Sequence, residues 1–414
     1  MSLSALLDAA LADPTLVRWR ESVGSASLDL TAPPGLRPLA IAGLARERFV
    51  LAVTATTREA EDLVETLGCL LGRSAVAEYP SWETLPHERL SPRADTVGRR
   101  VAVLRRMAHP GEHPDGPLQV VVAPVRSVLQ PQAKGLGDLE PLRLSAGDAA
   151  DLDEVGRRLV DLAYARVEMV ERRGQFAVRG GILDVFPPTD EHPVRVEFFG
   201  DEVDEIRSFA VADQRSIGPL PDGHGLDAPP CREVLLTPEV QARAAALLAA
   251  HPELSDILGK LAAGVPAEGM EAFAPVLIDE LVLLIEELPA GAHVVVADPE
   301  KVRARAADLT RTSAEFLDAA WGAAAYGGKA PVDLGAAAYH TFADVRAHAA
   351  AVGVPWWSVT PFTADEEIDD DSLVAAARLA PSYRGDTEAA IASASGCPRT
   401  RSSPPASRPS PPAA

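Results

Sequence analysis

Apolar runs alternate with amphipathic stretches in the first third of the chain. Residues 49–54 (FVLAVT) and 119–123 (QVVVA) are almost entirely apolar, which predicts buried β-strands, and residues 58–71 between them predict a helix. Leucines at helical spacing predict a first helix at residues 4–11. Apolar strands that alternate with helices are typical of a parallel sheet covered by helices. The pattern therefore predicts an α/β fold.

The pattern changes near Lys134. After a helix predicted at residues 151–165, residues 176–186 (FAVRGGILDVF) and 194–199 (VRVEFF) alternate as antiparallel strands do, and a Gly-Asp turn leads to a further strand at 202–209. These segments predict a small α+β domain of about 85 residues, inserted in the larger α/β body.

Beyond Pro219 the chain returns to the first pattern. Its remaining predicted elements are helices at 238–249 and 252–261 and strands at 293–297 (HVVVA) and 354–359 (VPWWSV). Asp298 is predicted to be the N-cap of a helix that has Pro299 at its first position. A further unit is predicted to begin near His340.

Charge narrows the classes of partner. The chain has 39 basic and 60 acidic residues, a net charge of −21, which disfavours sequence-independent binding to nucleic acid and favours a protein partner or a basic surface. Cys69, Cys231 and Cys397 lie far apart and form no C-x-x-C pair, as expected in a reducing compartment. Without a signal-peptide pattern or a long uncharged apolar run, the sequence predicts a cytoplasmic protein with no membrane partner.

Residues 393–414 form a segment of different composition. They contain six prolines and six serines, and no acidic residue follows Glu388, so we expect a disordered tail. Only four of the 39 basic residues are lysines, which indicates GC-rich coding. A shifted reading frame in such DNA yields this composition, whereas a natural Pro/Ser linker is the alternative.

The sequence contains no recognisable nucleotide-binding or catalytic motif. Lys260 and Lys329 follow a glycine but lack the other residues of a phosphate-binding loop, and Lys134 and Lys301 lack even the glycine. Residues 277–288 are predicted to form an amphipathic helix rather than a magnesium-binding strand end. The nine histidines are scattered, and no G-x-S-x-G is present. We therefore predict no catalytic, metal-binding or cofactor-binding residue in this chain.

Several blocks resemble the amino-terminal part of the transcription-repair coupling factors (Mfd), in that family's order. The resemblance extends to about Ala392, and the RGGILDVFPP block is shared with the excision-repair protein UvrB. The blocks are residues 53–63 (VTATTREAEDL), 79–104 (YPSWETLPHERLSPRADTVGRRVAVL), 176–188 (FAVRGGILDVFPP), 194–209 (VRVEFFGDEVDEIRSF), 268–277 (EGMEAFAPVL) and 294–306 (VVVADPEKVRARA).

The resemblance implies a UvrB-like, helicase-type parallel sheet with a degenerate nucleotide site. It implies this division: 1–30, an N-terminal helix packing on domain 1b; 31–132, domain 1a; 133–217, the inserted α+β domain 2; 218–340, domain 1b; 341–392, the start of domain 3; and 393–414, the tail. UvrB clamps DNA with a long aromatic hairpin, for which residues 79–100 are too short and too poor in aromatic residues.

In this family domain 2 binds UvrA, while RNA polymerase and DNA are bound by later parts, which include a motor that uses ATP and magnesium. We therefore expect a truncated chain that acts as an adaptor, recruiting UvrA to stalled RNA polymerase in nucleotide excision repair, and that is not itself an enzyme. The alternatives left open are the ATP-dependent DNA translocase of the whole family and a non-functional product of a broken reading frame.

The resemblance places the UvrA-binding arginines at Arg166 and Arg179, and strand alternation turns Arg179 away from the apolar side of its strand. UvrB has a further arginine where this chain has Ala177, which would weaken the contact or shift it to Arg172 and Arg173.

The alternatives for Arg166 and Arg179 are that they are surface residues without a function, or that they pair within the domain. Arg166 and Arg179 would then bind Glu168 or Asp184 and leave no charge for a partner. Arg195 and Arg207 are in any case predicted to be cross-strand partners of acids such as Glu197 and Glu205.

Overall fold

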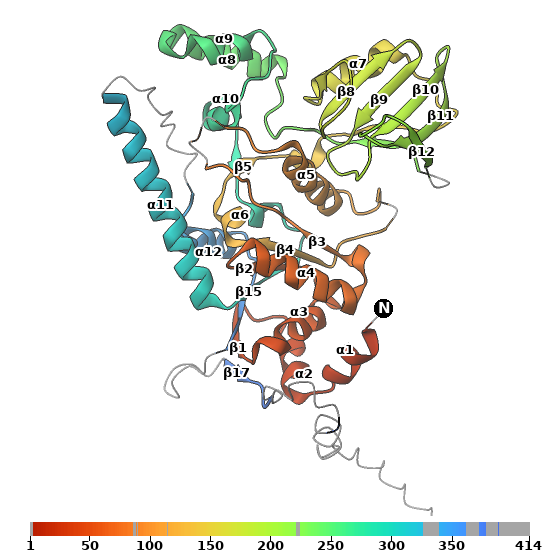
Figure 1. Ribbon diagram of the computed structural model, residues 1–414. Helices are drawn as coiled ribbons and strands as arrows, with labels where there is room; N and C mark the ends of the chain where they lie inside the picture. The colour runs from red at the N-terminus through yellow and green to blue at the C-terminus, as the bar shows by residue number, and fades with distance from the viewer. Residues whose placement is uncertain are drawn as a thin grey trace, which may run out of the picture. The chain divides into compact units, whose positions relative to one another are not determined.

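The structure is a computed structural model that describes residues 3–85, 88, 90–113, 115–220, 224–325, 339–361, 372–377 and 388. The tail predicted at 393–414 lies outside these residues. The main body is a seven-stranded parallel sheet in the order β17-β1-β16-β15-β2-β4-β3 (Figure 1). Its strands are β1 (Ser27–Thr31), β2 (Val50–Thr54), β3 (Val76–Glu78), β4 (Val120–Pro124), β15 (His293–Ala297), β16 (Trp356–Thr360) and β17 (Ser372–Val374). The predicted α/β class is confirmed.

Helices cover both faces of this sheet, and a separate apolar core lies on each face. Successive strand residues alternate between the two cores, so that Val50 and Ala52 belong to one and Leu51 and Val53 to the other. The first core is covered by α1 (Ser4–Ala10), α2 (Pro14–Glu21), α3 (Arg37–Ala45) and α4 (Thr57–Leu71). The second is covered by α5 (Ala94–Ala108), α6 (Val125–Leu129), α11 (Pro299–Ala325) and α12 (Phe342–Ala351).

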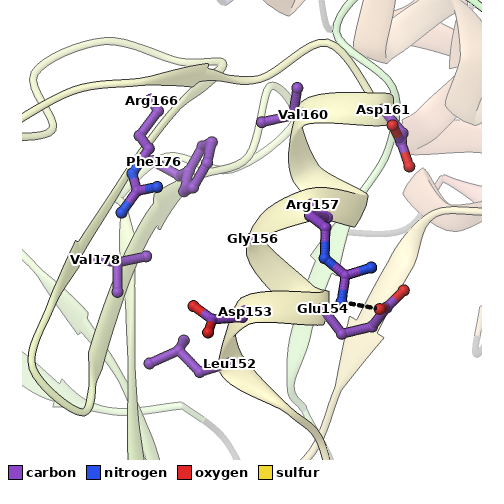
Figure 2. A pocket seen from close by; sticks show the side chains of 10 residues that line it. All are labelled: Leu152, Asp153, Glu154, Gly156, Arg157, Val160, Asp161, Arg166, Phe176 and Val178. Atoms are coloured by element: carbon purple, nitrogen blue, oxygen red, sulfur yellow. Dashed lines mark ion pairs between the residues drawn. The ribbon is translucent and has the colours of Figure 1, made fainter.

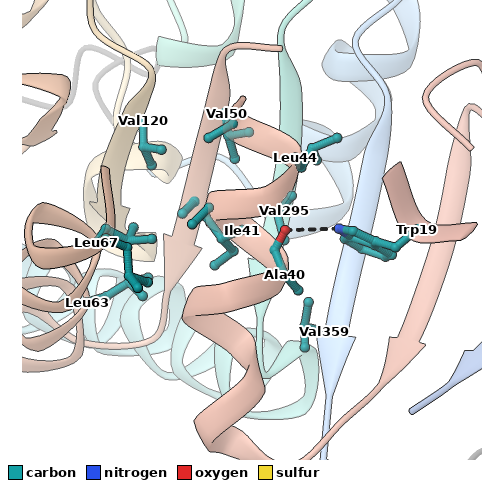
Figure 3. Packing of buried hydrophobic residues seen from close by; sticks show 14 of the residues in the cluster. Trp19, Ala40, Ile41, Leu44, Val50, Leu63, Leu67, Val120, Val295 and Val359 are labelled. Carbon is teal, nitrogen blue, oxygen red and sulfur yellow. Dashed lines mark hydrogen bonds between the residues drawn. The ribbon is translucent and has the colours of Figure 1, made fainter. Parts of the chain in front are cut away.

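The two N-terminal helices pack mainly on α3 and α4, and not on residues 218–340 as predicted. Leu7, Leu16 and Trp19 are fully or almost fully buried in the first core. The indole Nε1 of Trp19 donates a hydrogen bond of 3.2 Å to the Ala40 carbonyl oxygen of α3 (Figure 3). The apolar stripe of the first helices thus covers α3, which its own apolar sequence would otherwise expose.

The described residues of the range 341–392 complete the main sheet and do not begin a separate domain, which corrects the prediction. Strand β16 lies between β1 and β15, and β17 pairs with the other edge of β1. The strand predicted at residues 354–359 corresponds to β16, but its position inside the main sheet was not predicted. Trp357 and Val359 of β16 are buried in the first core, so this strand is needed to close it.

A second sheet forms the small α+β domain, with six strands in the order β12-β11-β10-β9-β8-β7. Neighbouring strands are antiparallel, except that β7 runs parallel to β8. The elements are α7 (Leu152–Asp161), β7 (Ala165–Arg166), β8 (Gln175–Arg179), β9 (Ile182–Phe186), β10 (Val194–Phe199), β11 (Glu202–Phe209) and β12 (Ser216–Pro219). Helix α7 covers one face, where Phe176, Leu183 and Val196 are buried with Val155 and Leu159 of the helix.

Two short strand pairs lie outside these sheets. In one pair, β6 (Leu142–Leu144) and β13 (Leu226–Ala228) join the two segments that flank the small domain. In the other, β5 (Gln132–Ala133) pairs with β14 (Leu281–Val282). The remaining helices are α8 (Pro238–Ala250), α9 (Ser255–Ala262) and α10 (Ala274–Leu277), and short 3₁₀ turns lie at Pro34–Leu36, Arg73–Ala75, Leu136–Asp138, Pro252–Leu254, Met270–Phe273 and Leu284–Glu287.

The amphipathic helix predicted at residues 277–288 does not form. Helix α10 ends at Leu277, and β14 and a 3₁₀ turn follow. Leu283, Leu284 and Ile285 are consecutive and all buried, a pattern that one face of an α-helix cannot provide. The Glu286 carboxylate closes the turn by accepting a hydrogen bond of 2.6 Å from the Leu283 amide.

Tyr79, Trp82 and Arg100 come from a stretch without periodicity in the sequence, and with Glu233 they form a buried polar network. The Arg100 side chain is fully buried, and its Nε lies 2.5 Å from Oε1 of Glu233. Trp82 Nε1 donates to the same oxygen at 2.9 Å, and the Arg100 guanidinium lies 4.3 Å from the centre of the Tyr79 ring. The network joins α5 and the segment before it to the segment that follows the small domain.

Candidate functional site

The four arginines singled out in the sequence are all exposed and all lie in the small domain, but they do not share one flat surface. Arg166 is in register with Phe176, so it lies on the face that α7 covers. Arg179 is three residues further along β8 than Phe176 and therefore belongs to the opposite face. Arg172 and Arg173 lie in the loop between β7 and β8.

Arg179 shares a buried carboxylate with a second arginine. Asp184 is 1% exposed, and its Oδ2 lies 2.5 Å from a terminal nitrogen of Arg179, whose own side chain is 49% exposed. Arg195 binds the same carboxylate in a bidentate manner, at 2.6 Å to Oδ1 and 2.9 Å to Oδ2. The pairing of Arg179 with Asp184 that the sequence left open is thus present. Arg195 alone can neutralise Asp184. The Arg179 side chain can therefore move to another partner without leaving the buried carboxylate unpaired.

Of the other ion pairs predicted for arginines of this domain, some are present and others are not. Arg207 pairs with Glu197 across the β10–β11 pair, as predicted, and also with Glu205 on its own strand. Arg195 instead turns to Asp184, because the β9–β10 register places those two residues opposite each other. No ion pair joins Arg166 to Glu168 or to any other residue that the structure describes.

Ala177 is the position at which the resemblance to UvrB implies an additional arginine. Its side chain is buried in a small apolar cluster with Val170, Phe186 and Phe209, so an arginine would not fit there in this chain. The loop that carries Arg173 packs beside this cluster: the Arg173 guanidinium lies 5.2 Å from the centre of the Phe186 ring, and its Nε donates a 2.9 Å bond to the Asp190 carbonyl oxygen.

Two features of this domain were not singled out in the sequence. Phe199, at the turn between β10 and β11, is 83% exposed and lies on the same face as Arg195 and Glu197. The alternation of residues 194–199 contained this signal, since one of two adjacent phenylalanines must face outward. The second feature is a cavity of about 520 Å³ between α7 and the β7–β8 edge (Figure 2). Gly156, in the middle of α7, lines this cavity. Among the described lining residues, it is the one whose identity in the sequence could have indicated open space beside the helix.

A buried acid, Asp298, lies at the carboxyl edge of the parallel sheet. Asp298 directly precedes α11, as predicted, but its backbone has a φ of 65° and its carboxylate pairs with basic side chains instead of capping the helix. Its Oδ2 lies 3.1 Å from the Lys301 ammonium and 3.6 Å from the Arg37 guanidinium. Across the described ranges, no three His, Cys, Asp or Glu side chains are arranged to hold a metal ion, and none of the helices there is long and apolar enough to cross a membrane.

The chain is similar to known proteins over most of its length. Residues 142–223 match the family model of the UvrB interaction domain. A transcription-repair-coupling factor of Mycobacterium bovis is 52% identical over 401 residues, which cover 92% of this chain and 32% of the relative. Those of Myxococcus xanthus and Bacillus subtilis are 33% and 27% identical over 67% and 65% of this chain, and over 24% of each relative. The chain thus spans about a third, or less, of the length of these curated relatives.

Proposed function

Because the chain is homologous to the transcription-repair-coupling factors over nine tenths of its length, we propose that it is an adaptor that binds UvrA in nucleotide excision repair. The observation that carries the proposal is the match of residues 142–223 to the UvrB interaction domain. Those residues fold as a domain with its own core, and this domain displays the exposed arginines that the family resemblance assigns to the UvrA contact. Delivery of UvrA to stalled RNA polymerase would require regions of the relatives that this chain does not match.

Arg179 is the proposed principal anchor, with Arg166, Arg172 and Arg173 as further contacts. A planar guanidinium that binds a carboxylate in two places is a frequent energetic centre of protein interfaces. Arg179 can bind a carboxylate of UvrA without loss to the domain, since Arg195 remains on Asp184. Arg195 and Arg207 are held more firmly within the sheet and are assigned a structural role.

The chain itself is proposed to hydrolyse no ATP. Its four lysines lack the sequence of a phosphate-binding loop, and the loop after β1 carries Pro33 and Pro34, which have no amide hydrogen to offer a phosphate. The carboxylate at the edge of the parallel sheet, Asp298, is engaged by Arg37 and Lys301. These features support an adaptor rather than a motor.

Titration calorimetry of UvrA against the whole chain tests the adaptor role. Truncating one partner of an interfacial charge pair costs about 2–5 kcal/mol, so we expect Arg179→Ala to weaken binding more than tenfold. Arg215→Ala is the matched control, because Arg215 lies in the same domain and its side chain is 86% exposed. Equal affinities of the two variants, with unchanged circular dichroism, would remove Arg179 from the interface. A wild-type chain that binds no UvrA would refute the adaptor role itself.

A further inference from the structure

The sheet of the small domain has an edge that is only half occupied. Strand β7 pairs with β8 only at Ala165 and Arg166, and the last bond of this ladder runs from the Val167 amide to the Phe176 carbonyl oxygen at 2.9 Å. Strand β8 continues to Arg179. Because alternate residues of a strand direct their backbone groups to the same side, the amide and carbonyl of Val178 face this edge, where the described residues provide no further strand.

The cavity between α7 and the sheet opens beside this free stretch of backbone. Its floor is apolar and includes Leu152, Phe176 and Val178, while its rim is charged. Figure 2 shows the Arg166 side chain extending along the strand past Phe176 towards Val178, and Arg157 turned to Glu154, with which it forms an ion pair of 2.5 Å. Arg166 is therefore the rim cation that remains available.

Gly156 keeps the cavity open on the helix side. A Cβ atom built on Gly156 would lie 3.9 Å from the nearest ring carbon of Phe176, an ordinary van der Waals distance. Glycine inside a helix costs about 1 kcal/mol relative to alanine, and neither a left-handed backbone nor a close contact requires it here. The space above Phe176 is thus a feature of the surface that a larger side chain would remove.

We propose that an extended segment of UvrA adds a strand to the free edge of β8, with an apolar side chain in the cavity. This inference rests on the proposed function and gives it a geometry. Successive side chains of a strand point to opposite faces of a sheet, so one added strand reaches both Arg166 on the α7 face and Arg179 on the other. The two arginines, which no flat partner can contact together, then become neighbours along a single segment.

The edge also defines the chemistry of its occupant. Main-chain hydrogen bonds to Val178 supply affinity for any extended backbone, and the cavity selects an apolar residue. Acidic residues next to that apolar one would pair with Arg166 and Arg179. A second copy of this chain is a poor candidate, because two chains that each carry a charge of −21 repel.

Gly156→Leu tests the cavity without touching a charge. The leucine side chain would occupy the space above Phe176 and favour the helix, so the fold should be kept while UvrA binding falls at least tenfold in calorimetry of the whole chain. Gly259→Leu is the matched control, because Gly259 lies in α9 with open space around it, and this variant should bind within twofold of wild type.

Val178→Pro tests the edge itself. It removes the free amide, which faces away from β9, and proline is tolerated on edge strands. Binding of Gly156→Leu and Val178→Pro at wild-type affinity, while Arg179→Ala weakens it, would overturn strand addition and leave the adaptor role standing. If wild type binds no UvrA, the adaptor role fails first. A wild-type dimer in sedimentation that Gly156→Leu dissociates would make a second copy the occupant and also overturn the proposal.

Discussion

Asp184 shows how far a single residue can be understood from the sequence. Alternation correctly predicts that Arg179 points away from the buried side of β8, and its side chain is half exposed. Alternation cannot decide between Glu168 and Asp184 as its partner, because that depends on the register of β8 and β9. In the structure this register places Asp184 opposite Ala177, within reach of both Arg179 and Arg195.

The Asp190 carboxyl is expected to make the stability of the fold depend on pH. Burial raises the pKa of its carboxyl from 3.8 to about 6, because the ionised form loses hydration. The unfolded chain therefore releases this proton at lower pH than the folded chain. The stability that Asp190 contributes is full below about pH 4 and is lost as the pH rises through 6.

The substitution Asp190→Asn should remove this dependence. At pH 7.5 we expect the variant to be more stable than wild type by about 1–2 kcal/mol, and at pH 4 the two should be equal. Urea unfolding at both pH values measures the difference. Parallel loss of stability in wild type and variant between pH 4 and 7.5 would show that the carboxyl is not the group that titrates.

At the scale of elements, long apolar or amphipathic segments were predictable and short ones were not. The strand predicted at 49–54 is β2, Val50–Thr54, because five consecutive buried residues leave a clear signal. Strand β7 has only two residues and depends on pairing with β8, so no local pattern could indicate it. The helix prediction for residues 277–288 was wrong although the segment is long. It is apolar enough for a helix, but its buried residues are consecutive.

Helix α5 offers a test on two adjacent positions of one element. The Arg100 side chain is fully buried and paired with the nearly buried Glu233, whereas that of Arg99 is 48% exposed and paired with Glu78. Removal of one partner from a buried ion pair costs about 3–5 kcal/mol, because the other charge stays without compensation. In the Arg99–Glu78 pair the guanidinium is in contact with solvent, although the Glu78 side chain is only 10% exposed, and a pair screened by solvent contributes at most about 1 kcal/mol.

We therefore expect Arg100→Met to lower the free energy of unfolding by about 3–5 kcal/mol, and Arg99→Met by less than 1 kcal/mol. Denaturant unfolding monitored by tryptophan fluorescence and circular dichroism gives both values. A loss below 1 kcal/mol for Arg100→Met as well would mean that the buried network contributes little to joining α5 to the segment around Glu233.

For the whole molecule, the sequence patterns indicated the parallel body and the inserted domain. The predicted positions of the N-terminal helices and of residues 341–392 were wrong. The N-terminal helices cover α3 and α4, and β16 and β17 belong to the main sheet. Such placements follow from which strands become neighbours, and β1 lies between strands more than 300 residues away in the chain. The candidate arginines were identified by resemblance, whereas their separation onto two faces required the sheet.

An assay of the whole chain checks the inference that it is no motor. Steady-state ATP hydrolysis, measured with and without duplex DNA, should not exceed a buffer blank, because no phosphate-binding loop is present in the sequence. Turnover that remains with the protein through two chromatographic steps and is lost in Asp298→Asn would assign hydrolysis to the edge of the parallel sheet.

Binding of UvrA to the small domain is best measured by hydrogen–deuterium exchange of the whole chain with and without saturating UvrA. We expect slower exchange in α7 and β8, residues 152–161 and 175–179, and unchanged exchange in β2, β4 and β15 of the parallel sheet. Protection confined to residues outside 142–223, or no protection at all, would contradict binding to this domain.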